Sequence, residues 1–117
     1  MFRFDDKLKV YLHRDPIDFR YGMNSLSILV EQAMQRNPMD CSLYVFGNRR
    51  RDRIKILAWD GNGFWLLMKR LEADRFVWPD NKTEVVTMTT DVLHELLDGD
   101  DITTIQRHPK REYLRVS

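Results

Sequence analysis

The stretch with the most distinctive chemistry lies between Gly47 and Trp65 and reads GNRRRDRIKILAWDGNGFW. Four arginines fall within the five positions from Arg49 to Arg53, and Asp52 is the single acid among them. Guanidinium groups this close together need water, carboxylates or phosphates as partners and are excluded from a hydrophobic core. Arginine forms paired hydrogen bonds with phosphate oxygens, so the cluster could contact a nucleic-acid backbone, whereas a solvated turn is the alternative.

Further basic and aromatic residues surround this cluster in the sequence. Tryptophans close to arginines are suited to stacking on the bases of single-stranded nucleic acid. The residues predicted to bind nucleic acid are Arg49, Arg50, Arg51, Arg53, Lys55, Lys69, Arg70 and Arg75. The residues predicted to form an aromatic interaction surface are Trp59, Trp65 and Trp78.

No other residues form a pattern that is typical of catalysis or metal binding. The single cysteine, Cys41, has no obvious base beside it, and the three histidines are scattered along the chain. A zinc site needs several cysteine or histidine ligands at short spacings, which this sequence does not offer. We therefore expect no catalytic residues, no metal, no cofactor and no enzymatic activity.

Composition indicates one ordinary globular domain. The chain has 117 residues, 43% hydrophobic and 32% charged, with a net charge of only +1, so any attraction for a polyanion must come from local clusters of charge. The apolar runs are far shorter than the roughly 18 residues of a membrane helix, and the N-terminal residues do not read as a signal peptide. We expect a cytoplasmic protein that does not bind membranes.

Hydrophobic periodicity predicts an α+β fold. Strands are expected at 8–12, 42–46, 53–59, 64–72 and 84–89, a long helix within 17–36, and a short helix at 89–99. Short connections favour an antiparallel meander of about four to five strands, with the long helix packed on one face. Residues 1–102 would form this domain, and residues 103–117 a basic tail that we expect to be mobile.

The tight turn between Trp59 and Trp65 predicts a hairpin. A three-residue loop, Gly61 to Gly63, with Gly63 in the left-handed conformation, would pair Trp59 with Trp65. The long helix would then cover the face that carries Ile54, Ile56 and Ala58, and both tryptophans would lie on the other face with Lys55 and Lys69. A loop of another length would shift the third strand and change this assignment.

Several motifs in this order resemble one family of bacterial proteins. The run from Pro16 to Gly22, PIDFRYG, followed by Leu26, Leu29 and Val30, resembles the opening motif of that family. Residues 43–79 resemble its central signature, and the run from Leu96 to Gly99 resembles its closing motif. The chain is similar to the TnpB-type small accessory protein of insertion sequence sixty-six elements, over roughly residues 8–102. It departs at Phe19, Tyr21 and Asn24-Ser25, where the family usually has Met, Lys and Asp-Gly.

This resemblance implies a role in the transposition of a bacterial mobile element. A separate, larger transposase would carry out the strand chemistry, and the small protein would assist it. Two hypotheses follow for its partner. In the first, the basic hairpin holds DNA phosphates at the ends of the element. In the second, the same surface docks on the transposase or on a co-encoded small protein, since tryptophan and arginine dominate protein interfaces. The oligomeric state is left open.

Overall fold

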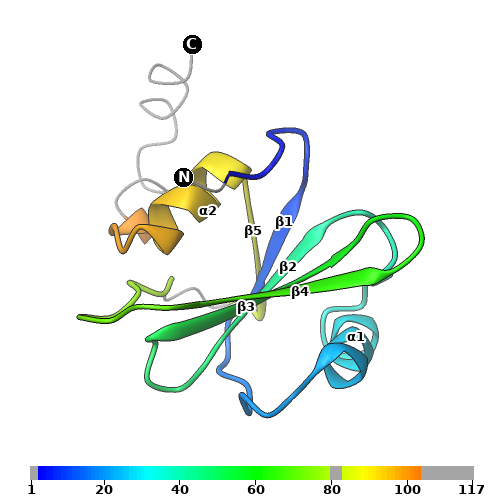
Figure 1. Cartoon of the computed structure of the whole chain (residues 1–117), viewed down its shortest axis with the longest axis horizontal. Helices are drawn as coiled ribbons and strands as arrows, with labels where there is room; N and C mark the ends of the chain where they lie inside the picture. Colours follow the sequence, from blue (N-terminus) through cyan, green and yellow to red (C-terminus); the bar gives the residue numbers. More distant parts are fainter. Residues whose placement is uncertain (1–2, 80–82, 104–117) are drawn as a thin grey trace.

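Five strands form a single sheet in the computed structural model, which describes residues 3–79 and 83–103 (Figure 1). The strands are β1 (Val10–His13), β2 (Leu43–Gly47), β3 (Arg53–Trp59), β4 (Phe64–Arg70) and β5 (Val85–Met88). They lie in the order β4-β3-β2-β1-β5. Strands β1 and β2 are parallel, and every other neighbouring pair is antiparallel.

One helix covers each face of this sheet, as Figure 1 shows. Helix α1 (Met23–Gln32) buries Leu26 and Val30 against the face that carries Tyr44 and Leu57. Helix α2 (Thr90–Leu97) buries an apolar stripe against the opposite face, and the Thr89 side chain caps its start by accepting a hydrogen bond from the Val92 N–H at 3.2 Å. We call these the α1 face and the α2 face. No helix in the described part of the chain is long and apolar enough to cross a membrane.

The predicted antiparallel meander with one long helix is wrong, although the class remains α+β. The sheet is mixed because the chain leaves β1, passes through α1 and returns as a parallel neighbour, β2. The helix begins only at Met23, because the residues before it are bonded in a non-helical path: the Ile17 N–H donates to the Gly47 carbonyl at 2.9 Å, and residues 18–21 form a turn closed by the Tyr21 N–H on the Asp18 carbonyl at 3.0 Å. It ends early because Gln35 adopts a left-handed conformation, with φ of 55°.

The predicted register of the β3–β4 hairpin is also wrong, by one residue. Trp59 pairs with Phe64 and Ala58 with Trp65, so the loop spans the four residues from Asp60 to Gly63. Gly61, not Gly63, takes the left-handed conformation, with φ of 106°. Because side chains alternate along a strand, this shift places Trp59 and Trp65 on opposite faces. Helix α1 therefore packs on the face of Leu57, and α2 on the face of Ile54 and Ile56.

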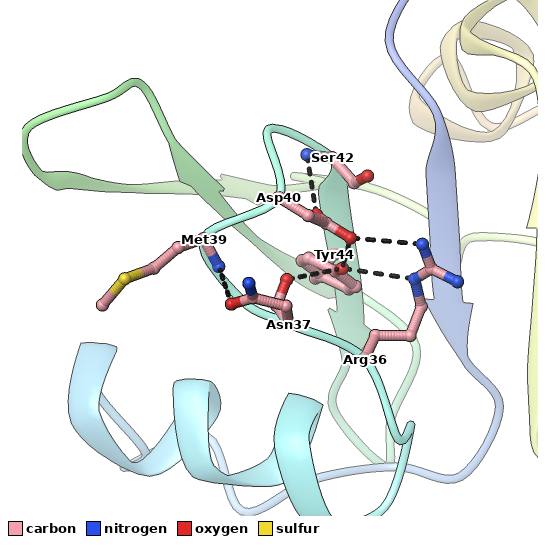
Figure 2. A network of polar contacts seen from close by, with 6 residues as sticks. All are labelled: Arg36, Asn37, Met39, Asp40, Ser42 and Tyr44. Atoms are coloured by element: carbon pink, nitrogen blue, oxygen red, sulfur yellow. Dashed lines mark hydrogen bonds and ion pairs between the residues drawn. The ribbon is translucent and has the colours of Figure 1, made fainter.

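A buried tyrosine fixes the connection between α1 and β2 (Figure 2). The Tyr44 hydroxyl lies 2.8 Å from a carboxylate oxygen of Asp40 and 3.1 Å from the Asn37 carbonyl, and it accepts from Arg36 Nε at 3.4 Å. The Arg36 guanidinium also donates to Asp40 and stacks 3.8 Å from the centre of the Tyr11 ring. Burial, and hydrogen bonding to Asp40, raise the pKa of Tyr44 to about 12. The network sets where β2 begins, and β2 leads directly into the arginine-rich turn.

Candidate nucleic-acid interface

The turn between β2 and β3 is built around Asn48. Its side-chain oxygen accepts hydrogen bonds from the backbone N–H groups of Asp52 and Arg53, each at 3.1 Å. Its amide nitrogen donates to the Asp52 carboxylate at 2.6 Å, which holds the pKa of Asp52 below its ordinary value. An asparagine that satisfies the turn backbone in this way fixes the direction of the arginines that follow it.

Arg51 points inward and anchors the turn. Its guanidinium lies 4.6 Å from the centre of the Trp78 ring, and Nη2 donates to the Arg14 carbonyl at 3.2 Å. The Trp78 indole N–H donates to the same carbonyl at 2.9 Å. Burial lowers the pKa of Arg51, since the charged form is partly removed from water. Arg51 therefore joins the turn to the end of β1 and to the segment around Trp78, and its charged group is engaged inside the protein.

Gly47 makes this close packing possible. A Cβ atom at position 47 would lie 2.8 Å from Cη2 of Trp78 and 3.1 Å from Nη1 of Arg51, which is too close for either group to stay in place. The Phe76 N–H completes the attachment by donating to the Arg51 carbonyl at 2.7 Å. The segment after β4 is thus bonded to the turn, which brings Arg75 to the same end of the sheet.

Five exposed arginines surround this anchored turn. Arg53 and Arg70 lie directly opposite each other at the open end of the β3–β4 hairpin, and Arg70 forms an ion pair with Glu72 at 2.9 Å. The Arg50 side chain is 77% exposed and lies 4.0 Å from Asp52. We call the set the arginine cluster: Arg49, Arg50, Arg53, Arg70 and Arg75. Facing cations are normally unfavourable in a hairpin, and the carboxylate of Glu72 offsets the charge of Arg70 in this pair.

The two predicted lysines lie outside this cluster. Lys55 sits on the α1 face, where Nζ donates to the carbonyls of Phe19 and Tyr21 at 2.6 and 2.8 Å, and burial lowers its pKa. Lys69 sits on the α2 face, where Nζ donates to the Leu97 carbonyl at 2.6 Å at the end of α2. Both lysines hold neighbouring segments to the hairpin, and they lie on opposite sides of the sheet.

The three tryptophans do not form one continuous surface. Trp59 packs edge-on against Phe64 on the α1 face, with ring centres 5.0 Å apart. Trp65 lies on the α2 face, is 59% exposed, and donates its indole N–H to Asp60 at 2.7 Å. Trp78 lies beneath the arginine-rich turn. Only Trp65 is exposed enough to meet a partner with most of its ring.

Sequence reasoning missed the residues that organise the turn. Asn48 and Gly47 could have been suspected, because asparagine and glycine favour turns, but the roles of Trp78 and the Arg14 carbonyl depend on distant contacts. Arg20 is a further exposed arginine in the segment held by Lys55. It forms a close pair with Asp18 at 2.6 Å, and this pair lowers the pKa of Asp18 to about 2. In the part of the chain that the structure describes, no group of three or more side chains could hold a metal ion.

The fold and this site together define a small α+β protein whose mixed sheet carries a rigid, arginine-rich turn at one end. Comparison with known proteins identifies the family of this protein. The family model for IS66 Orf2 like proteins matches residues 8–107, and the chain belongs to this family. Membership indicates an accessory role in the transposition of an insertion sequence, and the resemblance noted in the sequence is confirmed.

Two relatives from one organism match most of the chain. The chain is 34% identical over 110 residues to the uncharacterized protein y4jC of Sinorhizobium fredii (strain NBRC 101917 / NGR234). This match covers 94% of each chain. It is 33% identical over 106 residues to the uncharacterized protein y4hO of the same strain. This match covers 91% of this chain and 89% of the relative. No solved structure matches the chain.

Proposed function

We propose that this protein assists transposition by holding DNA phosphates at the ends of the mobile element with its arginine cluster. A separate transposase would carry out the strand chemistry, and both would act in the cytoplasm. The proposal rests on one observation: five exposed guanidinium groups gather around a turn whose own backbone is fixed from within. Guanidinium groups recognise phosphate oxygens through paired hydrogen bonds, and each phosphate contact releases counterions from the DNA.

The rigidity of the turn, in addition to its charge, supports the proposed binding of DNA. A flexible loop would lose conformational entropy when its arginines became ordered on DNA, which weakens binding. Here the Asn48 side chain and the Arg51 guanidinium already hold the backbone. Arg51, Lys55 and Lys69 act as internal supports, and phosphate contact is assigned to Arg49, Arg50, Arg53, Arg70 and Arg75.

Fluorescence anisotropy tests this proposal. The purified protein is titrated against a labelled duplex that carries the terminal repeat of the element and against a scrambled duplex, each at several salt concentrations. Three to five phosphate contacts predict a slope of roughly −3 to −5 in a plot of log affinity against log salt concentration. Stronger binding to the terminal repeat would show recognition of the element ends. Absence of binding even at low salt would reject the proposal.

The second candidate is docking on the transposase or on a co-encoded small protein without contact to DNA. One feature favours it: a hollow of about 490 Å³ lies at the end of the sheet away from the arginine cluster, and exposed Trp65 borders it together with Leu8 and Leu67. Apolar hollows beside an exposed tryptophan are typical of protein interfaces. Capture of the purified transposase after nuclease treatment would favour this candidate, and loss of capture in Trp65→Ala would locate it.

A further inference from the structure

Strand β4 forms an open edge of the sheet. It is seven residues long, its register with β3 runs without a bulge, and no described strand pairs with its outer side. It contains no proline. Natural proteins usually protect such edges, because the unpaired N–H and C=O groups can bind another strand. The other edge strand, β5, has only four residues.

The backbone groups that face outward on β4 can be assigned. At the two ends of the hairpin, the Leu71 N–H donates to the Asp52 carbonyl and the Asp60 N–H donates to the Gly63 carbonyl. Hydrogen-bonded pairs alternate along an antiparallel ladder, so Trp65, Leu67 and Lys69 direct their backbone groups toward β3. The outward N–H and C=O groups therefore belong to Phe64, Leu66, Met68 and Arg70.

The side chains of β4 are unusually exposed for apolar residues. Met68 is 62% exposed and Trp65 is 59% exposed, which makes them the two most exposed large hydrophobic residues in the described part of the chain. They lie on opposite faces of the same strand. An ordinary exposed residue needs no explanation, but apolar groups on both faces of an unpaired edge indicate a surface that another strand covers.

The order of residues along β4 shows which strand fits. The first residues, Phe64 and Trp65, are aromatic, and the last, Lys69 and Arg70, are cationic. An antiparallel copy of the same strand, centred on Leu67, would place each aromatic ring opposite a cation: Phe64 opposite Arg70 and Trp65 opposite Lys69. It would also place Leu66 opposite Met68, and it would pair all of the outward backbone groups. A parallel copy would place the cations opposite each other.

We propose that this protein forms a symmetric dimer in which the β4 strands of two copies pair in antiparallel fashion around Leu67. The two sheets become one continuous sheet, and the Met68 side chains are covered by Leu66 of the other copy. Cations over aromatic faces add to the backbone hydrogen bonds. The register is fixed because it is the one that overlaps the whole strand and keeps the four cations of the two strands apart.

The mass of the full-length protein in solution, measured by light scattering after gel filtration over a range of concentrations, tests this dimer. Trp65→Lys places like charges opposite each other twice in the dimer, and we expect it to raise the dimer dissociation constant at least tenfold. Trp65→Glu places a carboxylate opposite Lys69, and we expect a much smaller rise. Met39→Lys, at a residue 52% exposed and far along the chain from β4, is the control and should leave the dimer unchanged.

A crosslink tests the register independently. In a Cys41→Ser background, Leu67→Cys would bring two thiols together at the symmetry axis, and a mild oxidant should join the copies through a disulfide. Thr87→Cys, an exposed residue on the other edge strand, should not crosslink. A protein that is monomeric at all concentrations would overturn the proposal, as would a dimer that responds equally to Trp65→Lys and Trp65→Glu. Arg70 is the one residue of the arginine cluster that lies on β4, so neither result decides whether Arg49, Arg50, Arg53 and Arg75 bind DNA.

Discussion

Arg51 has exposed arginines as neighbours in the sequence, but we expect its substitution to lower the stability of the fold more than theirs. Its guanidinium stacks on Trp78 and donates to the Arg14 carbonyl, whereas the Arg50 side chain is 77% exposed. A charge-assisted hydrogen bond contributes about 1.5 kcal/mol or more, and a partly buried cation–π contact about 1 kcal/mol. Arg51→Ala also removes the cost of burying a charge. The Arg14 carbonyl keeps its bond from the Trp78 indole, so no acceptor is left unpaired.

The expected net loss for Arg51→Ala is therefore about 1.5 kcal/mol in the free energy of unfolding, or roughly 6 °C in the midpoint of thermal unfolding. Arg50→Ala, a substitution of the same kind in the same turn, should cost less than about 0.5 kcal/mol. Urea titration followed by circular dichroism measures both. Equal unfolding midpoints for the two variants would refute the view that Arg51 anchors the turn.

Three further predictions follow from buried contacts. Tyr44→Phe should lower the free energy of unfolding by about 1–2 kcal/mol in urea titration, because it removes the hydroxyl from its network with Asp40. Since the pKa of Tyr44 is about 12 in the folded protein and near 10 in the unfolded chain, wild-type stability should also fall as pH rises from about 10 toward 12, and Tyr44→Phe should lessen this fall. Burial lowers the pKa of His94, whose Nε2 accepts a hydrogen bond from the Phe4 N–H at 3.0 Å. The unfolded chain therefore binds a proton more readily than the folded protein, and the free energy of unfolding should fall as pH drops below about 6.5. His94→Gln should flatten this dependence between pH 7 and 5. Gly47→Ala should cost about 1–3 kcal/mol, seen as a lower urea midpoint, because its Cβ would displace the Trp78 ring.

Local pattern was enough to predict the strands but not their arrangement. The expected strand at 53–59 coincides with β3, because alternating apolar residues and flanking turns mark it clearly. The parallel pairing of β1 with β2 is a long-range contact, and nothing within either strand shows it. The 17–36 helix was predicted too long because residues 17–22 instead form a non-helical segment with a turn over residues 18–21, which contacts with Gly47 and Lys55 hold in place.

The candidate site shows the same limit at the level of single residues. Four neighbouring arginines look equivalent in the sequence, but Arg51 turns inward because Trp78, far along the chain, offers it an aromatic face. Lys69 looks like part of a basic patch, but the one-residue shift in register places it on the α2 face beside the end of that helix. Charge clustering is visible in a sequence; the direction of each charge depends on the register of the strands. The predicted basic tail, residues 103–117, lies beyond the described residues from position 104 onward.

The salt dependence of DNA binding in two matched variants tests the central claim most directly. Arg49→Ala with Arg50→Ala removes two positive charges from the arginine cluster. Lys7→Ala with Lys9→Ala removes the same charge from exposed residues just before β1, at the end of the sheet away from the cluster. We predict that the first pair weakens duplex binding and makes the slope of log affinity against log salt shallower by about 2, whereas the second leaves the slope unchanged. Equal effects of the two pairs would mean that DNA responds only to total charge, and would contradict a binding site at the arginine-rich turn.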